Sequence, residues 1–147
     1  MKQNDSVFFR YIYLVTLFLI TLTGFGAMPI FKRYYIADIP GFGWLDKFYV
    51  THYMHYFMAI IFIGLIFYAF VRNVVLEKMK VSLSGYIRGI MFSIITISGL
   101  FLVIKNLNCC YFSPNIVIIL DLIHVSSVMM FLIFALICLI FKLKWKK

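Results

Sequence analysis

The sequence predicts an all-α membrane protein, a four-transmembrane-helix bundle. Of the 147 residues, 65% are hydrophobic and only 13% are charged, and the mean hydropathy is +1.03. A soluble domain of this length has too small a core to bury so much apolar surface. We expect one integral membrane domain over residues 1–147, with spans near residues 8–31, 48–75, 85–104 and 115–141. Each span has about the 20 residues that a helix needs to cross a bilayer.

The connections between these spans are short. The first apolar run is too long for the core of a signal peptide, and no convincing cleavage site follows it, so we expect an uncleaved span. Pro40, Gly41 and Gly43 indicate turns before the second span. A charged segment over residues 76–84 and a short turn over residues 105–114 separate the later spans. We find no internal repeat.

The basic residues predict the orientation of the chain. Ten of the 14 Lys and Arg residues flank one side of the predicted spans, and the other side has Lys32, Arg33, Lys47 and Lys105. The positive-inside rule then places both termini in the cytoplasm, and we expect a multi-pass protein of the bacterial cytoplasmic (inner) membrane. The net charge of +9 is explained by this distribution, so we expect lipid and no nucleic acid as a partner.

The chain has three histidines, His52, His55 and His124, and all lie in or at the edge of apolar spans. Ionisable side chains at membrane depth are costly and indicate function, and imidazole is a common ligand for iron, copper and zinc. At a helical rise of about 1.5 Å per residue, His55 lies about 12 Å beyond Lys47, and His124 about 14 Å beyond Asn115. His55 and His124 are therefore predicted at matching depth in the outer half of the membrane.

Two glycines, Gly24 and Gly99, lie at a similar depth on the other two spans. Glycine destabilises a helix interior by roughly 1 kcal/mol relative to alanine, so its position needs a reason. Close helix contact is one reason, and a flat macrocycle against the backbone, in a bundle core that holds a cofactor, is another. We predict one haem b with His55 and His124 as iron ligands, and with Gly24, Gly99 and a peripheral His52 beside it.

Other interpretations remain open. A membrane histidine also bonds to a neighbouring helix or extends to the interface, as in a haem-free anchor or assembly subunit. His52 and His55 share a helix face and, with Asp121, would suit a small metal-handling protein. Met129 or Met130 is an alternative haem ligand. The cysteines form no C-x-x-C pair, so the usual cluster and covalent-haem motifs are absent.

Three segments carry a family resemblance: residues 10–25 (RYIYLVTLFLITLTGF), residues 51–55 (THYMH) and residues 121–125 (DLIHV). They resemble the first helix, the second-helix histidine region and the start of the last helix in the membrane cytochrome b subunits of formate dehydrogenases and nickel–iron hydrogenases. In that family, four helices hold two b-type haems, which pass electrons between an iron–sulfur partner outside the membrane and the quinone pool. The resemblance implies that His55 and His124 are the ligands of the outer haem.

The chain departs from the family pattern in two places. The first span has Tyr11 and Tyr13 but no histidine, and Ile137–Ile140 lie where a second histidine of the last helix is expected. We therefore expect a single-haem variant, whose two imidazole ligands suit electron transfer. With little sequence outside the membrane, it is expected to be a subunit of an oxidoreductase complex. It would join an extracytoplasmic redox partner, of the iron–sulfur or cytochrome c type, to quinone.

Overall fold

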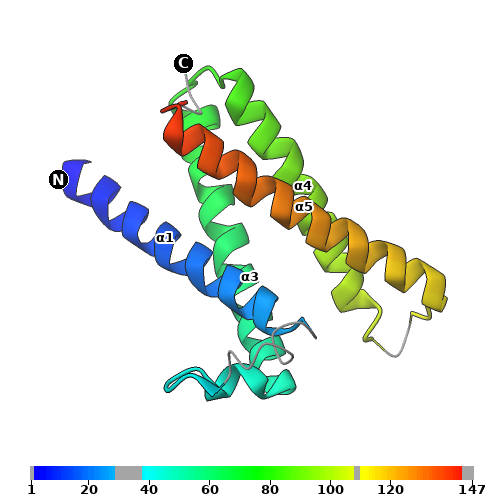
Figure 1. Ribbon diagram of the computed structural model, residues 1–147. Coiled ribbons are helices and arrows are strands. Elements are labelled where there is room, and N and C mark those ends of the chain that lie inside the picture. The colour runs from blue at the N-terminus through cyan, green and yellow to red at the C-terminus, as the bar shows by residue number, and fades with distance from the viewer. Residues whose placement is uncertain (1, 29–37, 108–109, 144–147) are drawn as a thin grey trace. The chain divides into compact units, whose positions relative to one another are not determined.

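The computed structural model of the protein describes residues 2–28, 38–107 and 110–143. Its long helices are α1 (Lys2–Gly26), α3 (Phe48–Phe70), α4 (Leu83–Ile104) and α5 (Pro114–Ile140), as Figure 1 shows. A short 3-10 turn, η2 (Gly43–Asp46), precedes α3, and a π-helical segment, η3 (Val71–Leu76), continues it.

In these ranges, four helices are long and apolar enough to cross a membrane: Val7–Gly26, Phe48–Leu76, Leu83–Ile104 and Pro114–Ile140. They coincide closely with the four predicted spans, and the all-α, multi-pass membrane character of the chain is confirmed. The first helix ends at Gly26, earlier than the predicted residue 31. That predicted end, and the basic residues Lys32 and Arg33, lie outside the described residues.

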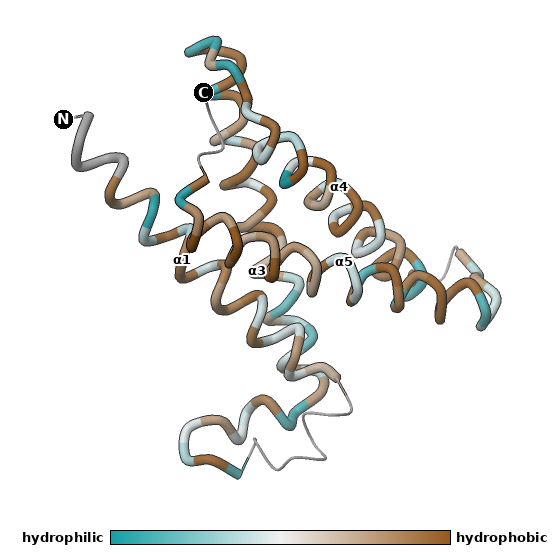
Figure 2. The backbone as a smooth tube through the Cα atoms, turned by 45° about the horizontal axis from the view of Figure 1, so that its top comes forward, coloured by the Kyte–Doolittle hydropathy of each residue, from teal (hydrophilic) through white to brown (hydrophobic). Residues whose placement is uncertain are grey.

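The helices form two hairpins, each a compact unit. The first unit ends at Arg72 and contains α1, η2 and α3, and the second begins at Asn73 and contains α4 and α5. Within the units, α1 packs on α3 and α4 packs on α5. Figure 2 shows apolar residues along most of each helix, which is the pattern of helices surrounded by lipid.

The starts of two helices are explained by their first residues. The side chain of Ser82 accepts a hydrogen bond from the backbone N–H of Gly85 (3.2 Å), which caps the first turn of α4. Helix α5 begins at Pro114, which suits a first helical position because no N–H is needed there. This start places His124 about 15 Å along α5, at a rise of about 1.5 Å per residue.

The hairpins bury few side chains, and half of these are hydroxyl residues. Large apolar side chains are exposed on all four helices, as expected where lipid takes the place of a protein core. Small hydroxyl residues at helix contacts let backbones approach each other closely, and a buried hydroxyl must be hydrogen-bonded to be tolerated. Among the described residues, the buried set is Thr16, Thr23, Leu45, Thr51, Phe62, Ser98, Phe131 and Cys138.

The η2 turn closes one end of the first hairpin. Leu45 is 2% exposed, and the Thr51 hydroxyl donates to the backbone oxygens of Leu45 (3.0 Å) and Lys47 (3.2 Å). A Cβ at Gly26 would lie 2.9 Å from Leu45 Cδ2 and 3.3 Å from Thr51 Cγ2. Only glycine at position 26 therefore leaves room for the Leu45 side chain as it lies.

Candidate functional site

The first hairpin holds the ring of His55 against α1. Its Nδ1 lies 3.1 Å from the backbone oxygen of Ile20 and 3.2 Å from Thr23 Oγ1. A carbonyl oxygen can only accept a hydrogen bond, so the proton of the neutral ring must be on Nδ1. The in-plane lone pair is then on Nε2, and this nitrogen is the one suited to bind a metal.

Gly24 provides the space in which the ring of His55 lies. A Cβ at position 24 would be 3.2 Å from His55 Cε1 and 3.5 Å from Nδ1. Carbon atoms prefer a separation of about 3.5–4.0 Å, so a side chain at this position would push the ring away from α1. Close approach is thus a sufficient reason for this glycine, with an imidazole edge against the backbone. A contact between Gly24 and haem stays a prediction.

The second hairpin repeats this arrangement with His124 on α5. Its Nδ1 lies 3.1 Å from the backbone oxygen of Ile95 and 3.0 Å from Ser98 Oγ, both on α4. A Cβ at Gly99 would lie 3.0 Å from His124 Cε1 and 3.4 Å from Nδ1. The same reasoning puts the proton of the neutral ring on Nδ1 and the lone pair on Nε2.

Both hairpins build the arrangement from similar local sequences. Residues 20–24 read Ile-Thr-Leu-Thr-Gly, and residues 95–99 read Ile-Thr-Ile-Ser-Gly. On the second helix of each hairpin, a phenylalanine two turns after the histidine is buried, Phe62 at 7% exposure and Phe131 at 8%. This local similarity was missed when the sequence was searched for internal repeats, because the match is short and the spacing from glycine to histidine differs between the two halves.

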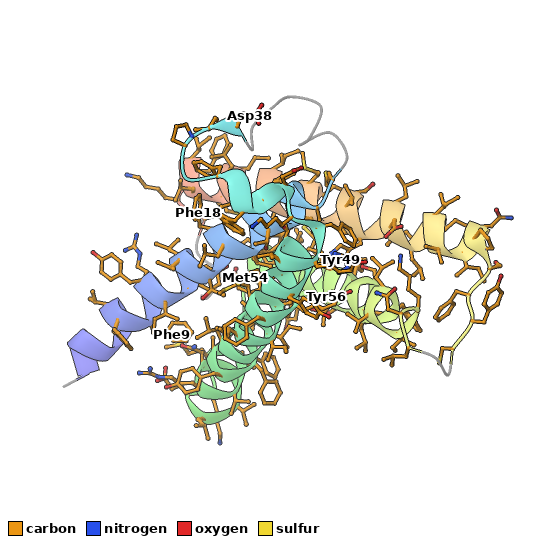
Figure 3. All side chains as sticks on the ribbon, turned by 90° about the horizontal axis from the view of Figure 1, so that it is seen from below. Phe9, Phe18, Asp38, Tyr49, Met54 and Tyr56 are labelled. Atoms are coloured by element: carbon orange, nitrogen blue, oxygen red, sulfur yellow. The ribbon has the colours of Figure 1, made fainter. Side chains whose placement is uncertain are left out.

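His52 lies in different surroundings, one turn before His55 on α3. Its ring stacks on Phe48, with centroids 4.9 Å apart and 29° between the planes. It also meets the ring of Tyr56 at 4.8 Å and 68°, and Figure 3 labels Tyr56 on this helix. His52 is therefore held among aromatic side chains of its own helix, and its place beside a haem stays a prediction.

Asp121 forms an ion pair on the surface of the second hairpin. Its Oδ2 lies 3.8 Å from Nζ of Lys105, and the two side chains are 55% and 24% exposed, respectively. The Nδ1 of His124 bonds to α4, so the carboxylate is not needed to orient that ring. Met129 and Met130 are exposed on α5. Over residues 2–28, 38–107 and 110–143, no group of three or more His, Cys, Asp or Glu side chains could hold a metal ion.

Sequence reasoning found the two histidines and the two glycines but missed the groups that orient the rings. These groups are the hydroxyls of Thr23 and Ser98 and the carbonyls of Ile20 and Ile95. The available signal was a hydroxyl residue directly before each glycine. Comparison with family models, with curated proteins and with solved structures finds no match to this chain.

Proposed function

We propose that the protein is a membrane-embedded b-type cytochrome subunit, in which His55 and His124 would bind the iron of one haem b. One observation carries the proposal: both imidazoles donate through Nδ1 to a backbone carbonyl of the neighbouring helix. Metal-ligating histidines almost always donate their other ring N–H to a partner of this kind, which fixes the tautomer and the ring orientation.

The donor set fits a haem. A haem iron needs only two protein ligands, since the porphyrin supplies the other four, and a pair of neutral imidazoles is a common choice. A structural zinc ion would take four protein ligands and a catalytic one three. Each hairpin by itself presents one imidazole that is held through its Nδ1, and we propose that the two imidazoles bind the same iron.

The residues of the chain would hold this group and limit its chemistry. When bound, the haem supplies one-electron transfer at its iron. His55 and His124 would both bind the iron, which suits electron transfer rather than the binding of a small molecule. Gly24 and Gly99 let each ring lie against the neighbouring helix, and the apolar surroundings tune the redox potential by limiting access of water.

We further propose that both termini are cytoplasmic and that the ligands lie in the outer half of a bacterial inner membrane. The distribution of Lys and Arg along the sequence supports this orientation. Lys47 and Lys105 flank the ends of α3 and α4 that lie nearer the two histidines. An extracytoplasmic iron–sulfur or cytochrome c subunit would then reach the haem from outside, and quinone would reach it from the lipid.

A reduced-minus-oxidised visible spectrum of the purified protein tests the proposal. We expect a b-type α band and a haem-to-protein ratio near one. His55→Ala and His124→Ala should each remove the band, whereas His52→Ala should keep it. Each variant is checked for accumulation in the membrane, so that loss of haem is not confused with loss of protein. His124→Gly should regain the band when imidazole is added, because the free ligand replaces the missing ring.

A different result would contradict each part of the proposal. A wild-type protein without an α band, expressed with ample haem, would refute it and favour a haem-free anchor. A haem-to-protein ratio near two would refute the single-haem assignment. A spectrum lost in His52→Ala and kept in His55→Ala would show that the wrong ring of α3 was chosen.

A further inference from the structure

We propose that Thr23 and Ser98 are positioning residues, which fix the planes of the two imidazoles and set the redox potential of the haem. This inference rests on the proposed function. It starts from the shared position of the two hydroxyls, each directly before the glycine against which the histidine lies. Both side chains are buried, Thr23 at 0% and Ser98 at 4% exposure.

The hydroxyl of Thr23 has a defined direction. It donates to the backbone oxygen of Leu19 at 2.8 Å, and it lies 3.1 Å from the backbone oxygen of Ile20. Because its hydrogen is used toward α1, the oxygen presents lone pairs to the Nδ1–H of His55, 3.2 Å away. The imidazole proton is therefore shared between a carbonyl and a hydroxyl oxygen from one turn of α1.

The hydroxyl of Ser98 is directed in the same way. It donates to the backbone oxygen of Ile94 at 2.8 Å and lies 3.1 Å from the backbone oxygen of Ile95. Its oxygen lies 3.0 Å from the Nδ1 of His124. Two separate helices thus produce the same short chain of hydrogen bonds, from imidazole to hydroxyl to carbonyl.

Such a chain affects both the geometry and the electronics of a ligand. Two acceptors on one helical turn define the plane of the ring more strictly than one acceptor, which permits rotation about a single hydrogen bond. Hydrogen bonds arranged in a chain polarise one another, and acceptors at Nδ1 raise the basicity of the ligating nitrogen. A more basic ligand stabilises ferric over ferrous iron, so these hydroxyls are expected to lower the haem potential.

Removing each hydroxyl while keeping the shape of the side chain tests the inference. The variants are Thr23→Val and Ser98→Ala, and Thr23→Ser keeps the hydroxyl. The controls are Thr16→Val, another buried threonine of α1, and Ser93→Ala, whose hydroxyl makes the same type of bond to Gly89 O (2.9 Å) on α4. The readouts are the midpoint potential and the g-values of the ferric low-spin signal, which depend on the angle between the imidazole planes.

We expect Thr23→Val and Ser98→Ala to raise the midpoint potential. A threefold change in the ratio of oxidised to reduced haem corresponds to about 30 mV for one electron. The g-values should change as well, and both controls and Thr23→Ser should behave as wild type. If the two variants lose the haem while Thr23→Ser keeps it with an unchanged potential, the positioning role is also supported.

Other outcomes would overturn the inference. A haem with wild-type potential and g-values in both Thr23→Val and Ser98→Ala would overturn it and leave the cytochrome assignment intact. A shift in Thr16→Val or Ser93→Ala of equal size would show a general effect of helix hydroxyls, and it too would overturn the inference. Absence of haem from the wild type refutes the proposed function itself, so the two failures are distinguishable.

Discussion

Alanine in place of Gly99 should displace the ring of His124 and weaken haem binding. The added Cβ would lie 3.0 Å from Cε1 of the ring and 3.4 Å from Nδ1. Because such carbon contacts prefer about 3.5–4.0 Å, the ring must move off α4 by about 0.5–1 Å. Gly99 lies within α4, where the hydrogen bonds of the helix hold its backbone in place. The imidazole side chain therefore moves more easily than the helix.

The displacement is large enough to disrupt the hydrogen bonds that orient the ring. The Nδ1 of His124 starts 3.1 Å from Ile95 O and 3.0 Å from Ser98 Oγ. A shift of about 0.5 Å or more takes both distances to the limit at which a hydrogen bond is lost. Each such bond is worth about 1 kcal/mol net. Since one to two kcal/mol is a factor of about 5–30 in an equilibrium constant, we expect haem affinity to fall by that factor.

Titration of the haem-free protein with haem measures this effect. The control is Gly89→Ala on the same helix, because a Cβ there meets nothing within 4 Å. Gly24→Ala should give a smaller loss than Gly99→Ala, since its Cβ would lie 3.2 Å rather than 3.0 Å from the ring that it meets. Equal haem affinity and equal midpoint potential in Gly99→Ala and Gly89→Ala would refute the role assigned to the glycine.

Two further predictions concern stability. Gly26→Ala should overpack the contact with Leu45, where the added Cβ would lie 2.9 Å from Cδ2, and lower the free energy of unfolding in detergent by about 1–3 kcal/mol. Gly64→Ala, with nothing within 4 Å, is its control, and equal stability of the two variants would contradict the packing argument. Asp121→Asn removes the exposed ion pair with Lys105 and should lower stability by less than about 1 kcal/mol. A larger thermal destabilisation would mean that the pair is better ordered than its exposure indicates.

The long helices could be predicted from the sequence because the bilayer sets their length and composition. A run of about 20 apolar residues has little choice of structure in lipid, where each backbone polar group must be satisfied within its own segment. The π-helical segment η3 at Val71–Leu76 was not foreseen. It contains Arg72 and Asn73 among four apolar residues, and hydropathy has no signal for a change in the hydrogen-bonding pattern of the backbone.

The histidines were predictable as site residues, but their partners were not. The rise per residue of a helix was enough to predict that Gly24 and His55 lie at a similar depth in the membrane. Depth depends only on the number of residues from the end of a span. Rotation about the helix axis decides which atoms face the ring, and single-sequence counting does not fix it. For this reason the hydroxyl of Thr23 and the carbonyl of Ile20 emerged only from the structure. An aligned comparison of the two halves of the chain would have indicated Thr23, since a hydroxyl residue occupies the same position in both.

The surroundings of the two histidines match at some positions and differ at others. Thr23-Gly24 and Ser98-Gly99 give matching contacts to imidazoles on helices that otherwise differ in sequence. The position one turn before each histidine does not match: it holds His52, stacked on an aromatic ring, in the first hairpin and Asp121, paired with a lysine, in the second. If the protein binds haem as proposed, variants at the matching positions should therefore change the haem affinity or the midpoint potential. Variants at His52 and Asp121 should leave the visible spectrum intact, since these side chains lie against other groups.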